Sequence, residues 1–290
     1  MTPLVYVVIV NWRGWRDTLA CLASLGKLNY PRYKIVVVDN GSGDDSVARI
    51  RAAHASVTLL ETGCNLGFAG GNNVGIRHAL SDGATYIWLL NNDTVVDPNA
   101  LTAMVAVAEA DAHVGAVGVV LLDMTSPDRI QAWGGGHVNM WLGRSRYCAA
   151  PTPAGRLDYL SGASMVVRAD VFRRIGALDD GFFMYWEDTD FAFRLRRSGY
   201  RLAVAEHARV WHKESASTGK NSAVLDAYFS ASAVRFFRRY APLAVVPITI
   251  GAGSKILKRV WQGDWERVHA VWHGLRGHPL RGSNRQHRSP

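Results

Sequence analysis

The feature that most constrains the fold is a regular alternation of short, β-branched apolar runs with segments of helical character. Five runs are almost wholly apolar, as buried strands are, and they span residues 4–10, 34–39, 57–61, 86–91 and 114–120. Between them lie four segments that we expect to be helices, at residues 16–25, 45–54, 70–81 and 98–110. This order predicts an α/β fold with a parallel sheet covered by helices on both faces.

The second half of the chain is less regular. After about residue 125 the pattern loosens into Gly- and Trp-rich loops, and it resumes with strand-like runs at 163–168 and 201–205. The last sixty residues form a helical, basic region. With 290 residues, 48% of them hydrophobic, the chain can form one large domain with an appendage.

Charge is concentrated at the carboxyl end. Residues 235–290 contain 11 basic and 2 acidic side chains, and this net charge of +9 equals that of the whole chain. Residues 1–234 therefore balance, with 22 basic and 22 acidic side chains. Such a tail suits either a nucleic acid or an anionic membrane surface.

The cysteines and the amino terminus indicate a reducing compartment. Cys21, Cys64 and Cys148 have no CxxC spacing, so neither a zinc ribbon nor a disulfide framework is indicated. The first residues, MTPLVYVVIVNW, lack a positive n-region and are expected to form a strand rather than a signal peptide. We therefore expect a cytoplasmic protein.

Short polar side chains follow two of the predicted strands. They are Asp39, Asn40 and Ser42 after the 34–39 run, and Asn91, Asn92 and Asp93 after the 86–91 run. In open α/β sheets, ligands gather at the carboxyl ends of strands. These residue types also stabilise turns, and for either cluster alone that interpretation is equally good. As a ligand site, Asp93 could bind a divalent cation on a diphosphate, because Mg²⁺ is usually held by one or two carboxylates and substrate oxygens.

A glycine-rich segment, NLGFAGGNNVGI, occupies residues 65–76. It does not fit the GxGxxG or GK[ST] patterns of dinucleotide and ATP sites. It indicates either a close approach of the backbone to a ligand, with Asn72 and Asn73 as polar contacts, or helix capping and tight packing.

An acidic cluster lies in the segment GFFMYWEDTDFAFRLRR, residues 181–197. Glu187 and Asp188 suit general-base chemistry, in which a carboxylate accepts the proton of a hydroxyl nucleophile. Asp190 precedes Arg194 by four residues, which predicts a structural salt bridge on a helix. The alternative is a helix that begins with acids because the macrodipole favours them there.

Several aromatic residues have two possible roles, in the core or as a flat apolar surface for a ligand. We expect Phe182 and Phe183 to lie in the core. The sequence leaves both roles open for Tyr185, Trp186, Trp133 and Trp141.

Five motifs occur in a specific order: DNGSGD (39–44), NLGFAGGNNVGI (65–76), LLNNDT (89–94), FFMYWEDTDFAFRLRRSGYR (182–201) and ARVWH (208–212). Together they resemble the inverting family 2 glycosyltransferases, over roughly residues 4–240. The likeness is strongest to the bacterial rhamnosyltransferase-like branch that builds cell-surface polysaccharides. The resemblance implies a GT-A fold, that is, a Rossmann-like mixed sheet flanked by helices, here with a helical basic extension.

The resemblance also implies roles for individual residues. Asp188 would be the catalytic base, and Glu187 would hold an acceptor hydroxyl or raise the pKa of that base. Asp93 would hold Mg²⁺ or Mn²⁺ on the donor diphosphate, with Asn91 and His212 as further ligands. Many family members have Asp-x-Asp where this chain has Asn91-Asn92-Asp93. The donor-binding set would comprise Val10, Asn11, Asp39, Asn40, Ser42, Asn65, Gly67, Asn72 and Asn92, with Asp39 reading the nucleobase.

The predicted organisation is a catalytic domain at residues 1–230 and a basic tail at 231–290. Within the domain, residues 1–125 would bind the nucleotide sugar and 126–230 the acceptor. The donor would be a dTDP-, UDP- or GDP-sugar, most consistent with dTDP-L-rhamnose, and the acceptor a glycan or lipid-linked glycan. A homodimer is possible, and nucleic acid is not an expected partner.

The tail is expected to lie on the inner face of the membrane. Its uncharged stretch, residues 240–254, is shorter than the ~20 residues needed to span a bilayer and contains Pro242 and Pro247. Basic residues flank it, and Trp265 and Trp272 follow, a mixture typical of interfacial segments. Packing of these helices on the catalytic domain, or a dimer contact, is the alternative.

Two other classes of function remain open. One is a sugar-nucleotide nucleotidyltransferase, although NWRGWRD at residues 11–17 fits its first loop poorly. The other is a non-catalytic binding protein, against which the retained Asp93, Asp188 and His212 argue.

Overall fold

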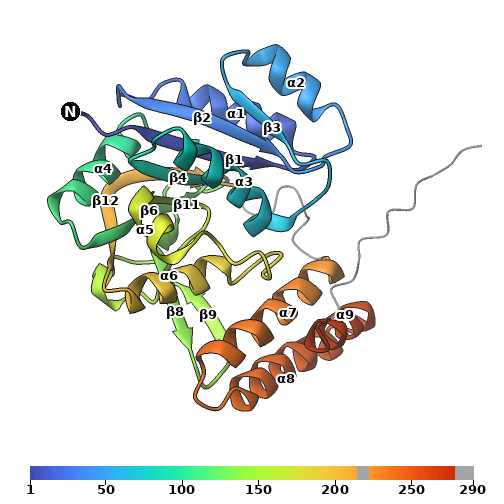
Figure 1. The fold of residues 1–290 in the computed structure, drawn as a ribbon. Helices are drawn as coiled ribbons and strands as arrows, with labels where there is room; N and C mark the ends of the chain where they lie inside the picture. The colour runs from blue at the N-terminus through green and yellow to red at the C-terminus, as the bar shows by residue number, and fades with distance from the viewer. Residues whose placement is uncertain (214–221, 278–290) are drawn as a thin grey trace, which may run out of the picture. The chain divides into compact units, whose positions relative to one another are not determined.

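The computed structural model describes residues 1–213 and 222–277, which divide into two compact units. Within the described residues, unit 1 comprises residues 1–138, 145–183 and 187–213, and unit 2 comprises residues 139–144, 184–186 and 222–277. Figure 1 shows the elements of both.

Unit 1 is built around one mixed sheet, with strand order β3-β2-β1-β4-β11-β6-β12-β5 and β7 paired to β6. The strands are β1 (Val5–Asn11), β2 (Tyr33–Asp39), β3 (Thr58–Glu61), β4 (Tyr86–Asn91), β5 (Thr94–Val96), β6 (Val114–Asp123), β7 (Ile130–Trp133), β11 (Ser164–Arg168) and β12 (Arg201–His212). Strands β3, β2, β1 and β4 run parallel, β11 is antiparallel to both of its neighbours, and β12 runs parallel to β6. The predicted α/β class is therefore confirmed, as a mixed sheet.

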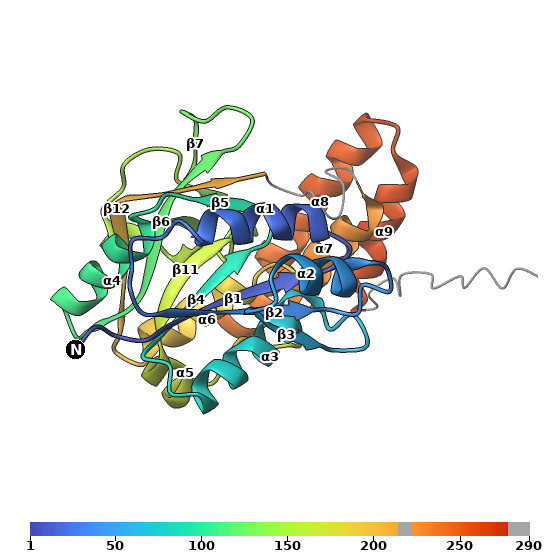
Figure 2. The ribbon, with the colours of Figure 1, turned by 90° about the horizontal axis from the view of Figure 1, so that it is seen from above.

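Helices cover both faces of this sheet, as predicted; Figure 2 shows α1 and α3 on opposite sides of it. They are α1 (Trp15–Leu25), α2 (Ser46–Ala53), α3 (Gly67–Ser81), α4 (Ala100–Ala110), α5 (Ala169–Ile175) and α6 (Glu187–Arg197). A short 3₁₀ turn η1 (Ala154–Arg156) and a small sheet, β10 (Tyr159–Leu160), β8 (Gly135–Asn139) and β9 (Arg144–Tyr147), complete the elements. The four predicted helices lie within three residues of their expected starts and ends.

The core has two halves, one on each face of the sheet. On β1, Val7 and Ile9 belong to the cluster that includes α1 and α4, whereas Tyr6 and Val8 belong to the cluster that includes α3 and α6. Successive residues of a strand point to opposite faces, so a strand buried on both sides must be apolar throughout. Gly75 brings α3 close to β1, because a Cβ there would lie 2.3 Å from Val8 Cγ1.

Two parts of unit 1 differ from the sequence expectation. Strand β12 continues to His212 instead of ending at residue 205, through an irregularity between Ala205 and Arg209, and it pairs with both β6 and β5. The region after residue 125, expected to be loops, contains β7 to β10. These strands are short, so their side-chain pattern carries little periodic signal.

Unit 2 is helical, with α7 (Ala223–Tyr240), α8 (Val245–Trp261) and α9 (Trp265–Leu275). Asp226 on α7 joins the three helices, because it accepts hydrogen bonds from Arg259 Nε of α8 (3.0 Å) and Arg267 Nε of α9 (2.7 Å). The indole of Trp186 packs against Phe236 and Phe237 of α7. Among residues 1–213 and 222–277, no helix has the length and apolarity needed to cross a bilayer.

Burial places the aromatic residues that the sequence left open. Phe182 is buried in unit 1, as expected of a core residue, and Phe183 is partly buried. Trp133 is buried within unit 1, Trp186 is buried within unit 2, and Trp141 is exposed.

Candidate active site

The polar residues that follow β1, β2 and β4 meet at one edge of the sheet. The strand register places Asn11 beside Asp39 and Val10 beside Asn91. Because these strands are parallel and adjacent, their carboxyl ends form one continuous edge, which is where ligands bind in open α/β folds. The structure thus brings together side chains from positions as distant as 11 and 91.

Asp39 is almost completely buried at this edge. Its Oδ1 accepts hydrogen bonds from Asn11 Nδ2 (2.8 Å) and Ser42 Oγ (2.6 Å), and its Oδ2 accepts one from Ser42 N (3.1 Å). Arg13, with φ +55°, donates its backbone N–H to Ser42 Oγ (2.9 Å). The carboxylate of Asp39 therefore holds the turn after β2 in one conformation. Arg13, which contacts this turn, was not identified by the sequence analysis.

Asn40 fixes the loop that leads into α3. Its Nδ2 donates to Gly67 O (3.0 Å) and Asn65 Oδ1 (3.1 Å), and its Oδ1 accepts from Leu66 N (3.0 Å). Gly67 has φ +75°, and a Cβ there would lie 2.2 Å from Phe183 O, so no other residue fits. The glycine-rich segment thus brings the backbone before α3 against the backbone that precedes the acidic cluster.

The asparagines of α3 bond to backbone. Asn72 Nδ2 donates to Phe68 O (2.9 Å), one turn earlier. Asn73 bonds both groups of Leu178, donating to its carbonyl (2.8 Å) and accepting from its N–H (3.1 Å). Both side chains therefore bond to backbone groups of the protein itself. This agrees with the interpretation of the glycine-rich segment as helix capping and tight packing.

A chain of buried hydrogen bonds connects the ends of β4 and β2. Asn92 Nδ2 donates to Thr18 Oγ1 (3.1 Å), Thr18 Oγ1 donates to Asn11 Oδ1 (2.8 Å), and Asn11 Nδ2 donates to Asp39. A fully satisfied buried network of this kind rigidifies its surroundings. The network therefore fixes the edge on which the candidate donor residues lie, and Thr18 of α1 is a member that sequence reasoning missed.

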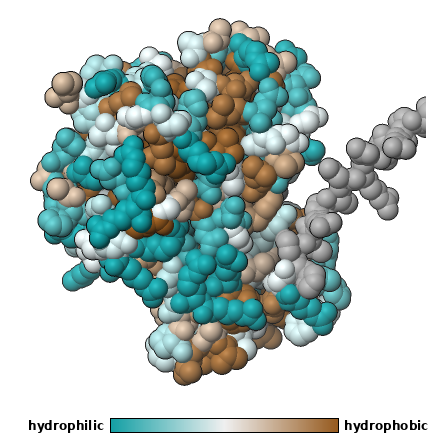
Figure 3. Space-filling view, viewed as in Figure 1, coloured by the Kyte–Doolittle hydropathy of each residue, from teal (hydrophilic) through white to brown (hydrophobic). Residues whose placement is uncertain are grey.

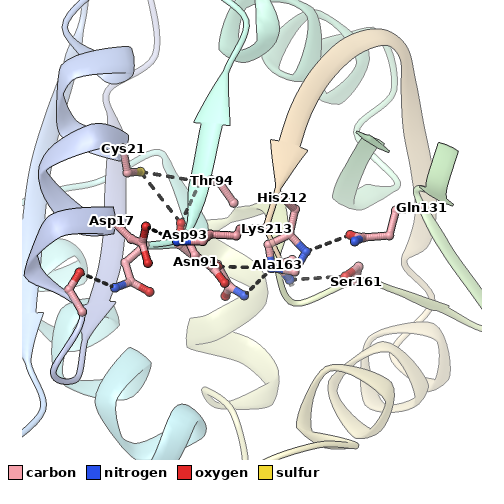
Figure 4. A network of polar contacts seen from close by, with 12 residues as sticks. Asp17, Cys21, Asn91, Asp93, Thr94, Gln131, Ser161, Ala163, His212 and Lys213 are labelled. Atoms are coloured by element: carbon pink, nitrogen blue, oxygen red, sulfur yellow. Dashed lines mark hydrogen bonds and ion pairs between the residues drawn. The ribbon is translucent and has the colours of Figure 1, made fainter. Parts of the chain in front are cut away.

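Asp93 and His212 come together from the end of β4 and the end of β12, with Nε2 3.2 Å from Oδ1 (Figure 4). On its other side, His212 Nδ1 lies 2.8 Å from Gln131 Oε1. A carbonyl oxygen only accepts, so Nδ1 carries a proton and the lone pair of a neutral imidazole points from Nε2 toward Asp93. Asn91 Nδ2 also lies 3.2 Å from Nε2.

This pair fits a divalent cation. Two ligands at ~2.1 Å on adjacent octahedral positions stand roughly 3.0 Å apart, close to the observed separation of Nε2 and Oδ1. Asn91 Oδ1 is buried and has no hydrogen-bond partner in the described part of the chain. Residues 1–213 and 222–277 contain no group of three His, Cys, Asp or Glu side chains that could hold a metal, so other ligands would come from substrate or water.

The acidic cluster begins α6. Asp188 Oδ2 accepts a hydrogen bond from Gly162 N (2.9 Å), and its Oδ1 accepts from the N–H (2.6 Å) and hydroxyl (3.1 Å) of Thr189. Burial raises the pKa of Asp188, and these hydrogen bonds oppose the rise. Burial, and next the charge of Asp188, raise the pKa of Glu187 well above its usual value. Glu187 Oε2 has no partner among the residues described.

One short segment connects the acidic cluster to the Asp93 region. Gly162 N donates to Asp188, and the next residue, Ala163, accepts a hydrogen bond from Asn91 N (2.9 Å) through its carbonyl. Asn91 and Ala163 are labelled in Figure 4. Gly162 contacts the candidate base and its neighbour Ala163 contacts Asn91, so the candidate base and this candidate cation ligand lie close together.

Asp190 has the structural contact that its spacing predicts. It is completely buried and accepts a hydrogen bond from Arg194 Nε (2.8 Å). Arg194 also donates to the carbonyls of Ile175 (2.9 Å) and Ala177 (2.8 Å). The ion pair therefore fastens α6 to the segment that follows α5.

Comparison with known proteins gives the family. Residues 3–235 match the family described as "Glycosyltransferase like family 2". The chain belongs to this family. It is 27% identical over 248 residues to an N-acetylglucosaminyl-diphospho-decaprenol L-rhamnosyltransferase of Mycobacterium tuberculosis, covering 77% of this chain and 80% of the relative. It is 29% identical over 220 residues to the galactofuranosyltransferase GlfT1 of the same organism, covering 73% and 71%.

This family 2 glycosyltransferase has the fold that its motifs imply. The mannosyltransferase PcManGT of Pyrobaculum calidifontis, solved with GDP-Man and Mn²⁺, superposes with a TM-score of 0.60 at 18% identity, over 98% of this chain and 77% of the other. The expected GT-A fold and the resemblance to the rhamnosyltransferase-like branch are both confirmed. The roles of individual site residues remain predictions.

Proposed function

We propose that this glycosyltransferase moves a sugar from a nucleotide sugar to an acceptor hydroxyl with inversion, and that Asp188 is the general base. The acceptor oxygen forms a bond to the anomeric carbon while its proton passes to Asp188. The bond from that carbon to the diphosphate oxygen breaks, and the nucleoside diphosphate leaves with the electron pair. The observation that carries the proposal is the environment of Asp188, a partly exposed carboxylate held by Gly162 and Thr189 with a raised pKa.

The raised pKa suits this role. A general base works best when its pKa lies near the working pH, because it is then both deprotonated and basic enough. Two backbone amides hold Asp188 in one orientation, so it requires little rearrangement to accept a proton. Glu187 is buried beside it, and burial and next the charge of Asp188 raise the pKa of Glu187, so it would act as a protonated partner that contacts an acceptor hydroxyl. The cause that raises the pKa of Asp188 is its own burial.

The donor would bind along the sheet edge, within residues 1–125, and the acceptor within residues 126–230. Asp39 would read the nucleobase, and Val10, Asn11, Asn40, Ser42, Asn65, Gly67, Asn72 and Asn92 would shape the donor site. Asp93 and His212, with Asn91 nearby, would hold Mg²⁺ or Mn²⁺, which would neutralise charge on the diphosphate. The 3.2 Å separation of their atoms and the Mn²⁺ in the structure of the mannosyltransferase support this assignment.

For the sugar we favour L-rhamnose from dTDP-L-rhamnose, and for the acceptor a glycan on a diphospho-polyprenol. The relative from M. tuberculosis whose name contains this acceptor and sugar covers 77% of the chain and supports this choice. Such an acceptor is embedded in a membrane, so we place the enzyme on the inner face of the cell membrane, in the synthesis of cell-surface polysaccharide.

The test is a donor panel. The purified protein is mixed with dTDP-rhamnose, UDP-galactofuranose, GDP-mannose or UDP-N-acetylglucosamine and with an N-acetylglucosaminyl-diphospho-polyprenol, with Mn²⁺ or with EDTA. We expect release of dTDP and formation of a rhamnosylated lipid only with dTDP-rhamnose and Mn²⁺. Transfer from another donor would overturn the choice of sugar, and absence of transfer from every donor would overturn the assignment of acceptor.

A further inference from the structure

Helix α8 of unit 2 contains many apolar residues but buries almost none of them. Of its 17 residues, only Pro247 is buried. Leu257 is 71% exposed and Trp261 is 89% exposed, and Ile250 is exposed as well. These three residues are spaced i, i+7 and i+11, so they lie on one face of the helix.

The opposite side of α8 faces its neighbours and carries two charged side chains. Arg259 donates to Asp226 of α7, and Lys255 Nζ lies 3.6 Å from the same carboxylate. An amphipathic helix normally exposes its charged side chains. In α8, Lys255 and Arg259 instead point to Asp226, whereas Leu257 and Trp261 are exposed. Because a buried ion cluster with Asp226 and Arg267 fixes the rotation of α8, the outward position of its apolar face is a built feature of unit 2.

A second apolar element, the turn of residues 139–144, lies against α8. Gly143 has φ +63°, and a Cβ there would lie only 2.0 Å from Pro247 O, so the turn and the helix touch through their backbones. Asn139 Oδ1 accepts from the N–H groups of Trp141 (3.0 Å) and Leu142 (2.8 Å), which fixes the tip. Trp141 and Leu142 are both exposed.

We define the α8 surface by the exposed apolar residues of these two elements and by the exposed Leu243, which precedes α8. They are Trp141, Leu142, Leu243, Val245, Ile250, Leu257, Val260 and Trp261. Figure 3 shows hydrophobic side chains, in brown, gathered over the region where α8 is drawn in Figure 1. Contiguous apolar areas of this kind mark contact with a membrane or another protein.

Charge and aromatic residues around this surface decide between these partners. Residues 222–277 contain eight basic and three acidic side chains, a net charge of +5, and Arg235, Arg238 and Lys258 are exposed. Two copies of unit 2 would place one net charge of +5 against another and would repel each other. An anionic bilayer attracts a unit with this positive net charge. Trp265 and Trp272 of α9 are also exposed, and indoles favour the interface between lipid and water.

We propose that the α8 surface docks on an anionic lipid bilayer, with α8 lying in the plane of the interface and its apolar side inserted among the acyl chains. The proposal rests on the proposed function only for its purpose, which is to bring the enzyme to a lipid-linked acceptor. The binding itself follows from unit 2.

The experiment measures co-sedimentation of the full chain with vesicles. One set contains phosphatidylcholine only, and the other contains phosphatidylcholine and phosphatidylglycerol at 3:1. We expect stronger binding to the anionic vesicles that weakens as salt is raised. The variant Leu257→Glu should bind about tenfold or more weakly, because full burial of a leucine contributes about 1.5–3 kcal/mol.

The matched control is Ala52→Glu, which adds the same charge to an exposed position of α2 in unit 1. It should bind as the unmodified protein does. The uncharged variant Leu257→Ser, which should also bind more weakly, separates loss of apolar contact from charge repulsion. Thermal unfolding of each variant checks the fold, and Leu257 is so exposed that the midpoints should agree.

Three results would overturn the proposal. They are equal binding to both vesicle sets, unchanged binding of Leu257→Glu, and a dimer in solution that Leu257→Glu converts to a monomer while vesicle binding persists. The last would assign the surface to a second copy. Turnover with a short, water-soluble acceptor is the separate readout: if it fails while vesicle binding follows the expected pattern, only the proposed function fails.

Discussion

The neighbouring carboxylates Asp188 and Asp190 should respond in opposite ways to the same substitution. Asp190 is completely buried and paired with Arg194, so Asp190→Asn leaves a guanidinium without its counter-charge. Breaking a buried pair costs about 3–5 kcal/mol. Arg194 is partly exposed and keeps the carbonyls of Ile175 and Ala177, so we expect the low end, about 3 kcal/mol. At roughly 2–4 °C per kcal/mol, the melting midpoint should fall by about 6–12 °C.

Asp188→Asn should instead abolish proton acceptance while the fold persists. The amide has the same shape but only one acceptor oxygen, so it loses one of the hydrogen bonds from Gly162 and Thr189, which destabilises the fold. It also replaces a carboxylate whose charge is disfavoured by burial, which stabilises the fold. These effects on stability oppose each other, so the midpoint should move little. Turnover should fall by about 10²–10⁴-fold, the usual contribution of a general base.

The assay is donor turnover at a temperature where all three proteins are folded, combined with thermal unfolding monitored by circular dichroism. Donor affinity, measured by calorimetry, should be nearly equal in the three proteins. If Asp190→Asn loses turnover while folded and Asp188→Asn keeps it, the assignment of the base is wrong. If Asp190→Asn unfolds at the same midpoint as the unmodified protein, the buried ion pair between Asp190 and Arg194 does not add to the free energy of unfolding as expected.

Three further predictions follow from the same site. Glu187→Gln should raise the free energy of unfolding at neutral pH, because the pKa of Glu187 is raised in the folded protein. Such an acid contributes its full stability below its unfolded pKa of about 4.3, and this contribution is lost as pH rises through the folded pKa. The gain from Gln, which stays neutral, should therefore vanish near pH 4 in denaturation curves measured as a function of pH. Asp93→Asn should remove the stabilisation that donor and Mn²⁺ together give in thermal shift, about 2.7 kcal/mol at 100 times the dissociation constant, and full stabilisation in EDTA would count against a cation. Gln131→Leu should weaken Mn²⁺ binding about 10–100-fold by electron paramagnetic resonance, because His212 loses the acceptor that fixes its tautomer, and unchanged affinity would remove Gln131 from the site.

The sequence predicted the sheet well where burial is complete. Residues 4–10, 34–39 and 86–91 are largely apolar because both faces of the sheet are covered, and they lie within one residue of β1, β2 and β4. The latter part of β12 was not predicted as a continuation of the strand, because its exposed positions, such as Glu206 and His207, interrupt the apolar run. Partly exposed and irregular strands leave a weaker pattern.

For the candidate site, the sequence indicated one of the contacts seen in the structure and gave no signal for others. The spacing of Asp190 and Arg194 predicts their bond, because four residues make one helical turn. Thr18, Gln131 and Gly162 gave no local signal, since each acts on a residue far away in the chain, and only the folded arrangement brings them together. Gln131 lies in the short strand β7, where the sequence indicated only loops.

Unit 2 is assembled from three stretches of chain, of which residues 139–144 and 184–186 come from between parts of unit 1. This interleaving limits how such an enzyme can be engineered or can evolve. The helices cannot be exchanged as a cassette, because a cut before α7 leaves Trp186 without Phe236 and Phe237 and leaves the Gly143 turn without α8. Trp186 and Tyr185 both have positive φ, near +69° and +68°, and immediately precede Glu187. A fusion partner or truncation is therefore best placed beyond α9, where it leaves every piece of unit 2 in one molecule.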